Sequence, residues 1–328
     1  MHTIKAPKIA IIGAGLAGLN VASNLKDYAE VKLYEKDSQI GGNLQPLNIN
    51  EVIIDAGSQY FTARTKVFKQ FLQNQFNQTE LIEWKPRVMT IGPGIKAYRR
   101  NWFEPHYRCL PHMNKLCHKL ADQLELYTKS EITAINYQDA WILQQHEQQL
   151  SETYDWIILA LPTPKLSSLL PANCCFIDQI KPIITEPAMA VCLTFNQSLK
   201  LNYQAAKIRH SQIDWLYVES SKDPSIPSFN LVLHMTSDFA QEYINSDSQQ
   251  IIEIATLALH ELGINLPEHS NALTKIWPSA NLANALEEGF LLDSKLKLAA
   301  CGEWINQGGI EGAFMSGYLL AQELKKII

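Results

Sequence analysis

The sequence has no long hydrophobic run and no excess of basic charge. Its first apolar run is interrupted by glycines after Ile12, and no later run reaches the roughly 20 apolar residues that a membrane helix needs. We therefore expect no signal peptide, no membrane span and a cytoplasmic location. Lys and Arg number 28 against 33 Asp and Glu, and this balance argues against nucleic acid or another polyanion as a partner.

Cysteine is scarce and shows no metal-ligand spacing. The six cysteines form no C-x-x-C pair and no regular interval, as is typical of buried, reduced thiols in a cytosolic protein. His260-Glu261 is similar to the start of a zinc-binding helix, but Ile264 stands where the second histidine would be. We predict no disulfide and no metal site. The 328 residues suffice for one large domain or two interleaved ones.

The stretch Lys8–Asn43 has the order strand, glycine turn, helix, strand. The apolar run Ile9–Ile12 predicts a buried parallel strand, and it leads into Gly13-Ala14-Gly15-Leu16-Ala17-Gly18. In such a turn Gly13 makes the tight bend, Gly15 lets a pyrophosphate approach the backbone, and Gly18 lets helix and strand pack closely. The pattern predicts a dinucleotide site, and an ordinary strand-helix turn without a ligand is the alternative.

A carboxylate follows the second predicted strand, Val31–Tyr34. Glu35 stands roughly 20 residues after the glycines, where it can accept hydrogen bonds from an adenosine ribose. Its negative charge disfavours the 2′-phosphate of NADP, so we expect a different dinucleotide.

The segment that comes next distinguishes FAD from NAD. Lys36–Gly42 resembles the GG motif that follows the second strand in flavoprotein oxidases of the glutathione-reductase-like superfamily, and NAD dehydrogenases lack it. The resemblance implies that FAD is the cofactor. Asn43 stands where most relatives have Arg, which reduces a charge-assisted pyrophosphate contact of roughly 1.5–3 kcal/mol to one of about 1. The FAD contacts expected here are Leu16, Ala17, Lys36, Gly42 and Asn43.

A second informative stretch is Ile53–Arg64. Its motif D-x-G-[AS]-Q-Y-F-T-A-R resembles bacterial renalases, a branch of the FAD-dependent amine oxidase superfamily. The resemblance implies that the segment passes the isoalloxazine ring, with Gln59, Tyr60, Phe61 and Thr62 beside the flavin or the substrate. A polar strand end that caps a helix starting near Thr65 is the alternative.

The C-terminal part resembles the flavin motif of the same superfamily. Leu296–Ala300 predicts a strand, Gly302-Glu303 follows it, and the motif E-G-A-x-x-S-G opens a last helix from about Gly308. The resemblance implies that the helix amides face the flavin N1/O2 region and stabilise the reduced anion. Glu303 replaces the Asp usual in renalases, although amine oxidases commonly carry Glu there. The expected contacts are Gly302, Glu303, Ile310, Glu311 and Ala313.

FAD is expected to bind noncovalently. No Cys or His stands between Gln307 and Ile310, where it could reach the 8α-methyl group of the ring. In relatives of this fold the backbone at about Ile132 contacts the adenine, and Ala160 ends a strand beneath the FAD. We carry both over as expected cofactor contacts.

The middle of the chain predicts two further sheets. Leu124–Tyr127, Ser130–Tyr137 and Trp141–Gln145 predict a small β-meander, and Tyr154–Leu161 predicts the strand that closes the Rossmann sheet. Later strand-like segments alternate with one helix, Gln249–Leu262, and suggest a mixed sheet that roofs the flavin. These segments are Ala190–Phe195, Trp215–Val218 and Leu231–Met235.

We therefore expect an α/β fold: a Rossmann-like FAD-binding domain of the glutathione-reductase-like, amine oxidase type, with an interleaved mixed-sheet substrate domain. The expected FAD-binding domain is discontinuous and comprises 1–85, 107–165 and 278–328, and the substrate domain comprises 86–106 and 166–277. The basic-aromatic run Tyr98–Phe103 predicts a solvated loop rather than a nucleic-acid contact.

Resemblance to renalases implies an FAD-dependent oxidase. Its small-molecule hydride donor is a dihydronicotinamide, in particular a misreduced isomer of NAD(P)H, and O2 takes the electrons to give H2O2. Positioning the donor carbon about 3–3.5 Å from flavin N5 is the main demand on the protein. We expect Tyr60, His234 and Trp277 to converge over the isoalloxazine as the catalytic group. A strand-end His234 satisfied by backbone is the competing interpretation.

Two other functions stay open. An amine oxidase also fits Glu303 and the C-terminal motif, but Gly309 and Ile310 stand where one wall of its aromatic cage is expected. A flavin-binding protein without turnover is suggested by Asn43 and by the altered segment 219–225. We expect a monomer or homodimer.

Overall fold

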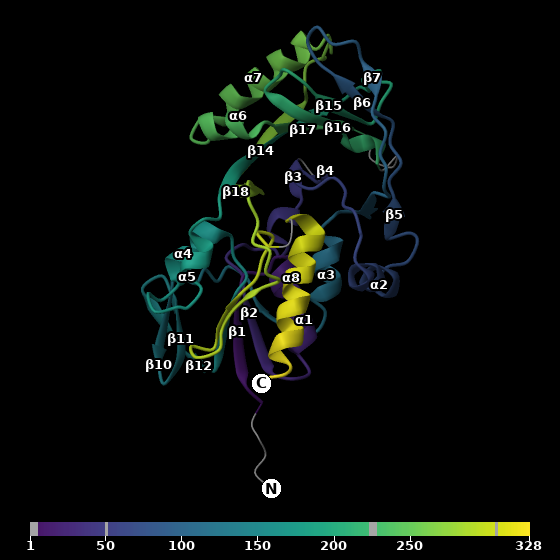
Figure 1. Cartoon of the computed structure of the whole chain (residues 1–328). Helices are drawn as coiled ribbons and strands as arrows, with labels where there is room; N and C mark the ends of the chain where they lie inside the picture. Colours follow the sequence, from purple (N-terminus) through teal and green to yellow (C-terminus); the bar gives the residue numbers. More distant parts are fainter. Residues whose placement is uncertain (1–5, 50–51, 223–227, 306–307) are drawn as a thin grey trace.

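The computed structural model describes residues 6–49, 52–222, 228–305 and 308–328. Two sheets, one in each half of the molecule, organise the fold (Figure 1). The lower sheet in Figure 1 has the order β19-β20-β13-β1-β2-β9. Its strands are β1 (Lys8–Ile12), β2 (Glu30–Tyr34), β9 (Glu125–Tyr127), β13 (Trp156–Leu159), β19 (Leu291–Asp293) and β20 (Leu298–Ala300).

The lower sheet is the predicted Rossmann sheet. β1 pairs in parallel with both β2 and β13, and only β19 runs antiparallel to its neighbour. The expectation for Leu124–Tyr127 was wrong, because β9 joins β2 in this sheet rather than a meander. A three-residue strand has too short a pattern to indicate its partner.

The meander covers one face of the Rossmann sheet and consists of β10 (Ala134–Gln138), β11 (Ala140–Gln145) and β12 (Gln148–Tyr154). The sequence missed β12 as its third strand, since exposed polar residues dominate it and conceal the apolar alternation. Trp141, Leu143 and Tyr154 pack from the meander against Ile157 and Leu159 of β13.

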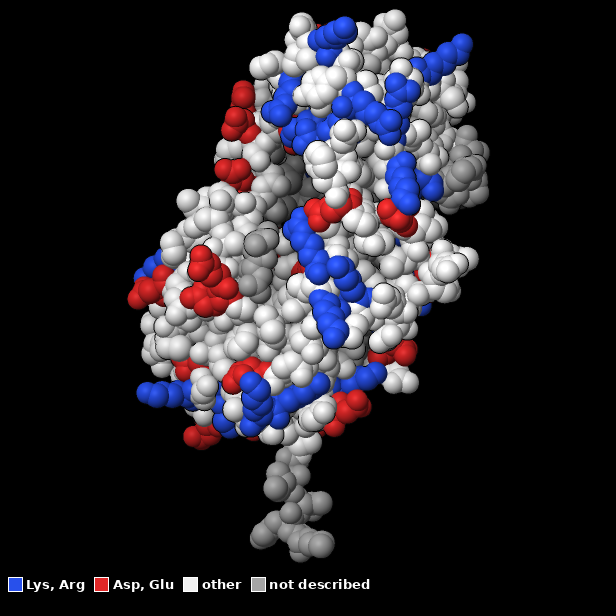
Figure 2. Space-filling model, turned by 45° about the vertical axis from the view of Figure 1, so that its right-hand side comes forward, with Lys and Arg blue, Asp and Glu red and all other residues white. Residues whose placement is uncertain are grey.

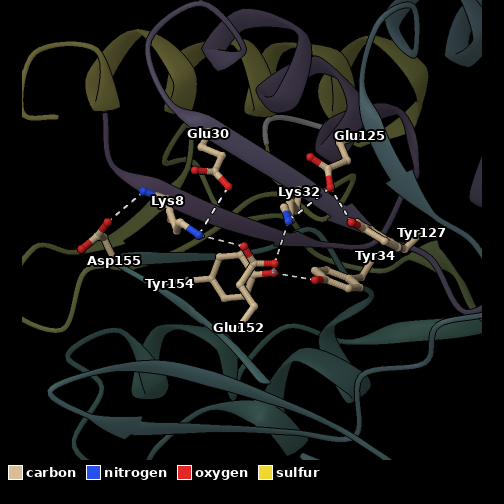
Figure 3. A network of polar contacts seen from close by, with 9 residues as sticks. All are labelled: Lys8, Glu30, Lys32, Tyr34, Glu125, Tyr127, Glu152, Tyr154 and Asp155. Carbon is tan, nitrogen blue, oxygen red and sulfur yellow. Dashed lines mark hydrogen bonds and ion pairs between the residues drawn. The ribbon is translucent and has the colours of Figure 1, made fainter. Parts of the chain in front are cut away.

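Lys32 lies at the centre of a polar network that fastens the meander to the sheet (Figure 3). Its Nζ lies 2.7 Å from Glu152 and 3.2 Å from Glu125, and Lys8 Nζ lies 2.9 Å from Glu152. Burial, the largest influence, raises the pKa of Glu152, but hydrogen bonds from Lys32, Lys8 and Tyr154 outweigh it and bring the pKa to about 2. Because the network joins β1, β2 and β9 of the sheet to β12 of the meander, it stabilises the packing of the meander on the sheet.

Helices α1 (Leu16–Leu25), α3 (Lys115–Leu120) and α8 (Gly309–Leu324) cover the other face, with α2 (Lys66–Gln75) beside them (Figure 1). Helices α1 and α8 approach closely: a Cβ atom on Gly317 would lie 2.3 Å from the Ala17 carbonyl oxygen. Asn20 Nδ2 also donates to the Phe314 carbonyl over 2.7 Å. The last helix therefore packs directly on the first.

The upper sheet has the order β18-β14-β17-β16-β15-β6-β7. All its pairs are antiparallel except β15 with β6. Helices α6 (Ser237–Glu242) and α7 (Ser248–Glu261) cover its outer face, while its inner face is turned toward the Rossmann half (Figure 1). Its strands are β6 (Val88–Ile91), β7 (Tyr98–Arg99), β14 (Thr185–Phe195), β15 (Ala205–Ile208), β16 (Ile213–Val218), β17 (Phe229–Met235) and β18 (Asn271–Leu282).

Several predicted elements of the upper half are confirmed, and one is corrected. The helix expected from Gln249 begins at Ser248, where the Asp247 side chain accepts from Gln249 N over 3.1 Å. The run Tyr98–Phe103 is not entirely a loop, since Tyr98–Arg99 forms edge strand β7. Strand β18 runs to Leu282 and so crosses residue 277, where the sequence placed the end of the substrate domain. The domain boundaries stay a prediction.

Short elements connect the halves. They are β3 (Leu47–Ile49), β4 (Val52–Ile54), β5 (Leu81–Glu83), β8 (Tyr107–Cys109), α4 (Thr163–Leu169), α5 (Ile177–Ile180), and the 3-10 turns η1 (Gly42–Leu44) and η2 (Glu219–Ser221). All six cysteines are free thiols. Within the described ranges, every helix is too short or too polar to cross a bilayer, and no cluster of three metal-ligating side chains occurs.

Candidate functional site

The glycine turn lies where β1 meets α1. Gly13 has φ +104°, and a Cβ atom there would lie 2.2 Å from the Ala160 carbonyl oxygen. A Cβ atom on Gly18 would lie 2.1 Å from the Gly13 oxygen, whereas one on Gly15 would meet nothing within 4 Å. Gly13 and Gly18 are therefore required for packing, and Gly15 leaves open space at the helix N-terminus, where an anionic pyrophosphate fits. Leu16 and Ala17 begin the buried face of α1.

Glu35 is buried at the end of β2. Its carboxylate accepts from the backbone N–H of Ala14 over 2.8 Å and of Asp37 over 2.9 Å. Burial, which outweighs these hydrogen bonds, raises the pKa of Glu35. The Glu35 carbonyl accepts from Ser130 N over 2.8 Å, so the segment leading to Ile132 lies beside it. Ile132 itself is buried in the core below the meander, and Lys36 is exposed.

The GG turn rests on the glycine turn. Gly42 has φ +54°, and a Cβ atom on it would lie 3.6 Å from Gly15 Cα. Next to it, Asn43 Nδ2 donates to Glu303 Oε1 over 2.8 Å. Burial, which is stronger than the opposing effect of this hydrogen bond, raises the pKa of Glu303 to about 7. The sequence predicted that Asn43 contacts the pyrophosphate. Its side-chain amide instead donates to Glu303, a residue 260 positions away.

The start of α8 is tied to the start of α2. The Glu311 carboxylate accepts from Arg64 N over 2.9 Å and Thr65 N over 2.6 Å. The Thr65 hydroxyl then caps α2 by accepting from Phe68 N over 3.3 Å. The helix start near Thr65 is confirmed, and the side chain of Glu311 is occupied by this cap.

The remaining expected contacts from α8 lie near its first turn. Ala313 is buried in the core of the Rossmann half, and Ile310 is half-buried against it. Gly302 is buried and donates its N–H to the Ser316 hydroxyl over 3.1 Å. Gln307 and residues 223–225, which entered the arguments on covalent attachment and on the substrate pocket, lie outside the described residues.

Consecutive side chains of the 59–62 segment point into different surroundings. Phe61 packs into the Rossmann core, with its ring 5.6 Å from that of Phe68, and its backbone pairs with Tyr107. Tyr60 lies instead among Trp84, Trp102 and His106, with ring centroids 4.7–5.8 Å away. Thr62 is half-buried. Tyr60, and not the Phe61 ring, therefore faces the space between the halves.

Aromatic side chains line the boundary between the upper sheet and the 55–60 segment. We call this group the aromatic wall, and its members are Tyr60, Trp84, Trp102, His106, Trp215, Tyr217, His234 and Trp277. Trp215 stacks on Tyr217 at 5.6 Å, and the Tyr217 ring lies 5.1 Å from His234. Most of these rings join one apolar cluster with Ile54 and Ala56.

His234, Trp277 and Tyr60, which the sequence predicts to converge over the isoalloxazine, all belong to the aromatic wall. His234 Nε2 is 2.9 Å from the Ala56 carbonyl oxygen, and burial lowers the pKa of His234. Trp277 lies beside Gly57, where a Cβ atom would be 3.5 Å from its ring. The wall also contains Tyr60. A strand-end histidine bonded to a backbone carbonyl is what the purely structural interpretation of His234 predicts. The catalytic role of His234 therefore stays a prediction.

Comparison with known families agrees with this geometry. Residues 11–74 match an NAD(P)-binding Rossmann-like domain. Residues 99–325, more than half of the chain, match the flavin containing amine oxidoreductase family. The chain belongs to this family. It is an FAD-dependent oxidoreductase, as the sequence predicted, and its fold is the expected one.

Solved structures similar to this chain share the whole architecture. A putative protoporphyrinogen oxidase from Exiguobacterium sp. 255-15 matches with TM-score 0.79 and 11% identity, over 98% of this chain and 99% of that one. Cyclohexylamine oxidase from Brevibacterium oxydans IH-35A matches with TM-score 0.74 and 12% identity, over 98% and 99%. Putrescine oxidase bound to putrescine matches with TM-score 0.73 and 10% identity, over 97% and 98%.

The protein also contains a buried ionic cluster that the sequence did not predict. Lys222 pairs with Glu219 and donates to the Gln59 side-chain carbonyl, and its Nζ lies 5.5 Å from the Trp84 ring centroid. Asp55 accepts from Met113 N over 3.1 Å, and burial raises its pKa. The buried ionic cluster comprises Asp55, Gln59, Arg108, Glu219 and Lys222, all at most 8% exposed.

The cluster joins both halves. Glu219 and Lys222 follow β16 in the upper sheet, while Asp55 and Gln59 belong to the segment that leads to Tyr60. Glu219 and Lys222 belong to the segment 219–225 that the sequence marked as altered, but the sequence gave no indication that they are buried. The ion pair between Lys222 and Glu219 lies within the turn after β16, and the hydrogen bond from Lys222 to Gln59 extends it across the halves. Burial of the Lys222 charge depends on both partners.

Proposed function

We propose that the protein oxidises a dihydronicotinamide, including misreduced isomers of NAD(P)H, and that O2 receives the electrons to give H2O2. The observation that carries this proposal is the aromatic wall. Its half-buried rings lie between the upper sheet and the 55–60 segment, where they can stack on a planar nicotinamide ring, and they are Tyr60, Trp102, Trp215 and Trp277. Aromatic stacking of this kind contributes about 0.5–1.5 kcal/mol beyond the burial of area.

The residues around the glycine turn suit FAD. Gly15 leaves space for the pyrophosphate, Glu35 offers a carboxylate for the ribose, and the N-terminus of α8 provides a positive field for the ring. FAD, which we propose is bound noncovalently, supplies the hydride acceptor at N5. The protein orients the donor and excludes water, and hydride transfer itself requires no protein acid or base.

An amine oxidase is the second candidate. The family match favours it, as do the similar structures of putrescine oxidase and cyclohexylamine oxidase. The residues before the E-G-A-x-x-S-G motif weigh against it, because Gly309 is exposed and Ile310 is aliphatic, so no ring stands there as a cage wall. A flavin protein without turnover is the third candidate.

Anaerobic mixing separates the three candidates. Purified protein is mixed without oxygen with reduced nicotinamide dinucleotides, including their misreduced isomers, and separately with primary amines, while the flavin absorbance near 450 nm is recorded. We expect bleaching only by the dihydronicotinamides, and stoichiometric H2O2 when air is admitted. Bleaching by amines alone would make the protein an amine oxidase, and bleaching by neither would exclude both oxidase proposals.

A further inference from the structure

Arg100 is an exposed cation at the end of the aromatic wall. It follows edge strand β7, and its backbone N–H donates to the Val88 carbonyl over 2.9 Å, so the sheet fixes its position. Its guanidinium carbon lies 5.9 Å from the centre of the Trp215 ring. At this distance the ring attracts the cation and limits its orientations.

The alternation of strand residues directs Arg100 toward the Rossmann half. Arg100 lies opposite Val88, which packs in the same apolar cluster as the aromatic wall. Its neighbour Arg99 lies opposite Met89, which packs in the core under α6 and α7. Because consecutive side chains of a strand point to opposite faces, Arg99 points away from the wall.

Among the described residues, the positive charge of Arg100 has no acidic partner. Lys207, which is also near the Trp215 ring, pairs with Asp214, and Glu104 pairs with Arg64 over 2.6 Å. Across the described ranges no ion pair joins Arg100 to an acidic side chain. Figure 2 shows Lys and Arg side chains gathered on the upper half, above a recess between the two halves. The field of Arg100 reaches Tyr60, whose pKa it lowers although burial, the larger effect, raises it.

We propose that Arg100 binds a phosphate of a dinucleotide donor whose nicotinamide ring lies on the aromatic wall. The inference rests on the proposed function and extends it to a substrate class, since it favours donors with phosphate groups over the free dihydronicotinamide ring. The planar guanidinium presents two N–H groups that match two phosphate oxygens. The same charge repels a substrate ammonium group, which disfavours amines.

The test uses the flavin-loaded enzyme and two donors. One is a reduced nicotinamide dinucleotide, and the other is N-methyl-dihydronicotinamide, which has no phosphate. Arg100→Ala should raise the KM for the dinucleotide about 10-fold to 100-fold, the equivalent of losing a charge-assisted hydrogen bond. The KM for the phosphate-free donor, the flavin content and the limiting rate of flavin reduction should stay within about twofold. Arg100→Lys should restore part of the loss, and Arg99→Ala is the matched control that should leave both donors unaffected.

Equal effects of Arg100→Ala on both donors, or none on the dinucleotide, would overturn the inference. If neither donor bleaches the wild-type flavin, the proposed function fails, and anion binding then decides the role of Arg100 independently. Inorganic pyrophosphate should change the tryptophan fluorescence of the wild type, because Trp215 lies against Arg100, and it should bind Arg100→Ala at least about tenfold more weakly. Equal binding to both proteins would overturn the inference.

Discussion

At the scale of single residues, Glu35 connects the glycine turn to the expected ribose site. Its two oxygens already accept from Ala14 N and Asp37 N, so an amide in its place would turn an NH2 group toward one N–H donor. We predict that Glu35→Gln weakens FAD binding by roughly 1.5–3 kcal/mol through loss of hydrogen bonds to a charged acceptor. Calorimetric titration of the flavin-free protein with FAD measures this change. The exposed neighbour offers a control, Lys36→Gln, and an unchanged affinity in Glu35→Gln would mean that other groups hold the ribose.

Glu303 makes stability depend on pH. Its pKa is about 7 in the folded protein against 4.5 for an ordinary glutamate, so the folded state holds the proton more tightly. This contribution to stability is complete below pH 4.5 and is lost as the pH rises through about 7. We predict that the melting temperature of flavin-free protein falls between pH 5 and pH 7.5, and that Glu303→Gln removes part of this fall.

Asn43 provides the matched comparison for Glu303. Its hydrogen bond lowers the pKa of Glu303, so Asn43→Ala should make the fall of the melting temperature with pH steeper. If the melting temperatures of the wild type and of Glu303→Gln change with pH in parallel, Glu303 does not titrate in the pH range of the prediction.

At the scale of elements, the buried ionic cluster links the turn after β16 to the segment before Tyr60. Removing one member of a buried pair leaves the other charge without a partner, which typically costs 3–5 kcal/mol, whereas replacing both with apolar groups is often neutral. We predict that Lys222→Met lowers the free energy of unfolding by about 3–5 kcal/mol. Adding Glu219→Leu to Lys222→Met should restore most of it, as measured by urea unfolding.

The exposed ion pair between Lys326 and Glu323 supplies a control for these variants. Lys326→Met breaks this surface pair at the end of α8 and should change the free energy of unfolding little. A double variant no more stable than Lys222→Met alone would show that the charge on Glu219 is not the source of the loss.

Individual helices and strands were predictable where the sequence signal is local. The strands with which each strand pairs were not predictable. The glycine turn, the apolar run of β1 and the helix α7 are each specified within a few residues, and all were found close to where they were expected. Strand β12 was missed because exposed polar residues dominate it. The sheet to which β9 belongs and the parallel pairing of β6 with β15, however, depend on contacts between distant segments. A single sequence contains no pattern that records such pairings.

At the scale of the whole molecule, the candidate site combines segments from every part of the chain. Motifs indicated its Rossmann side, because glycines at special positions and a carboxylate at a strand end have few alternative explanations. The bond from Asn43 to Glu303 and the cap that Glu311 provides for α2 could not be predicted, since each joins residues more than 240 positions apart. The aromatic wall was expected only in its three members Tyr60, His234 and Trp277.

The close packing of α8 on α1 has a consequence for the order of events during synthesis. The partners Asn20 and Phe314 are 294 positions apart, so α1 leaves the ribosome long before the helix that covers it. Until then the apolar residues of α1 have no lasting partner on that side, and a growing chain with uncovered apolar surface is prone to aggregate. The glycine turn is therefore made long before its surroundings are completed, and flavin capture must follow translation of α8.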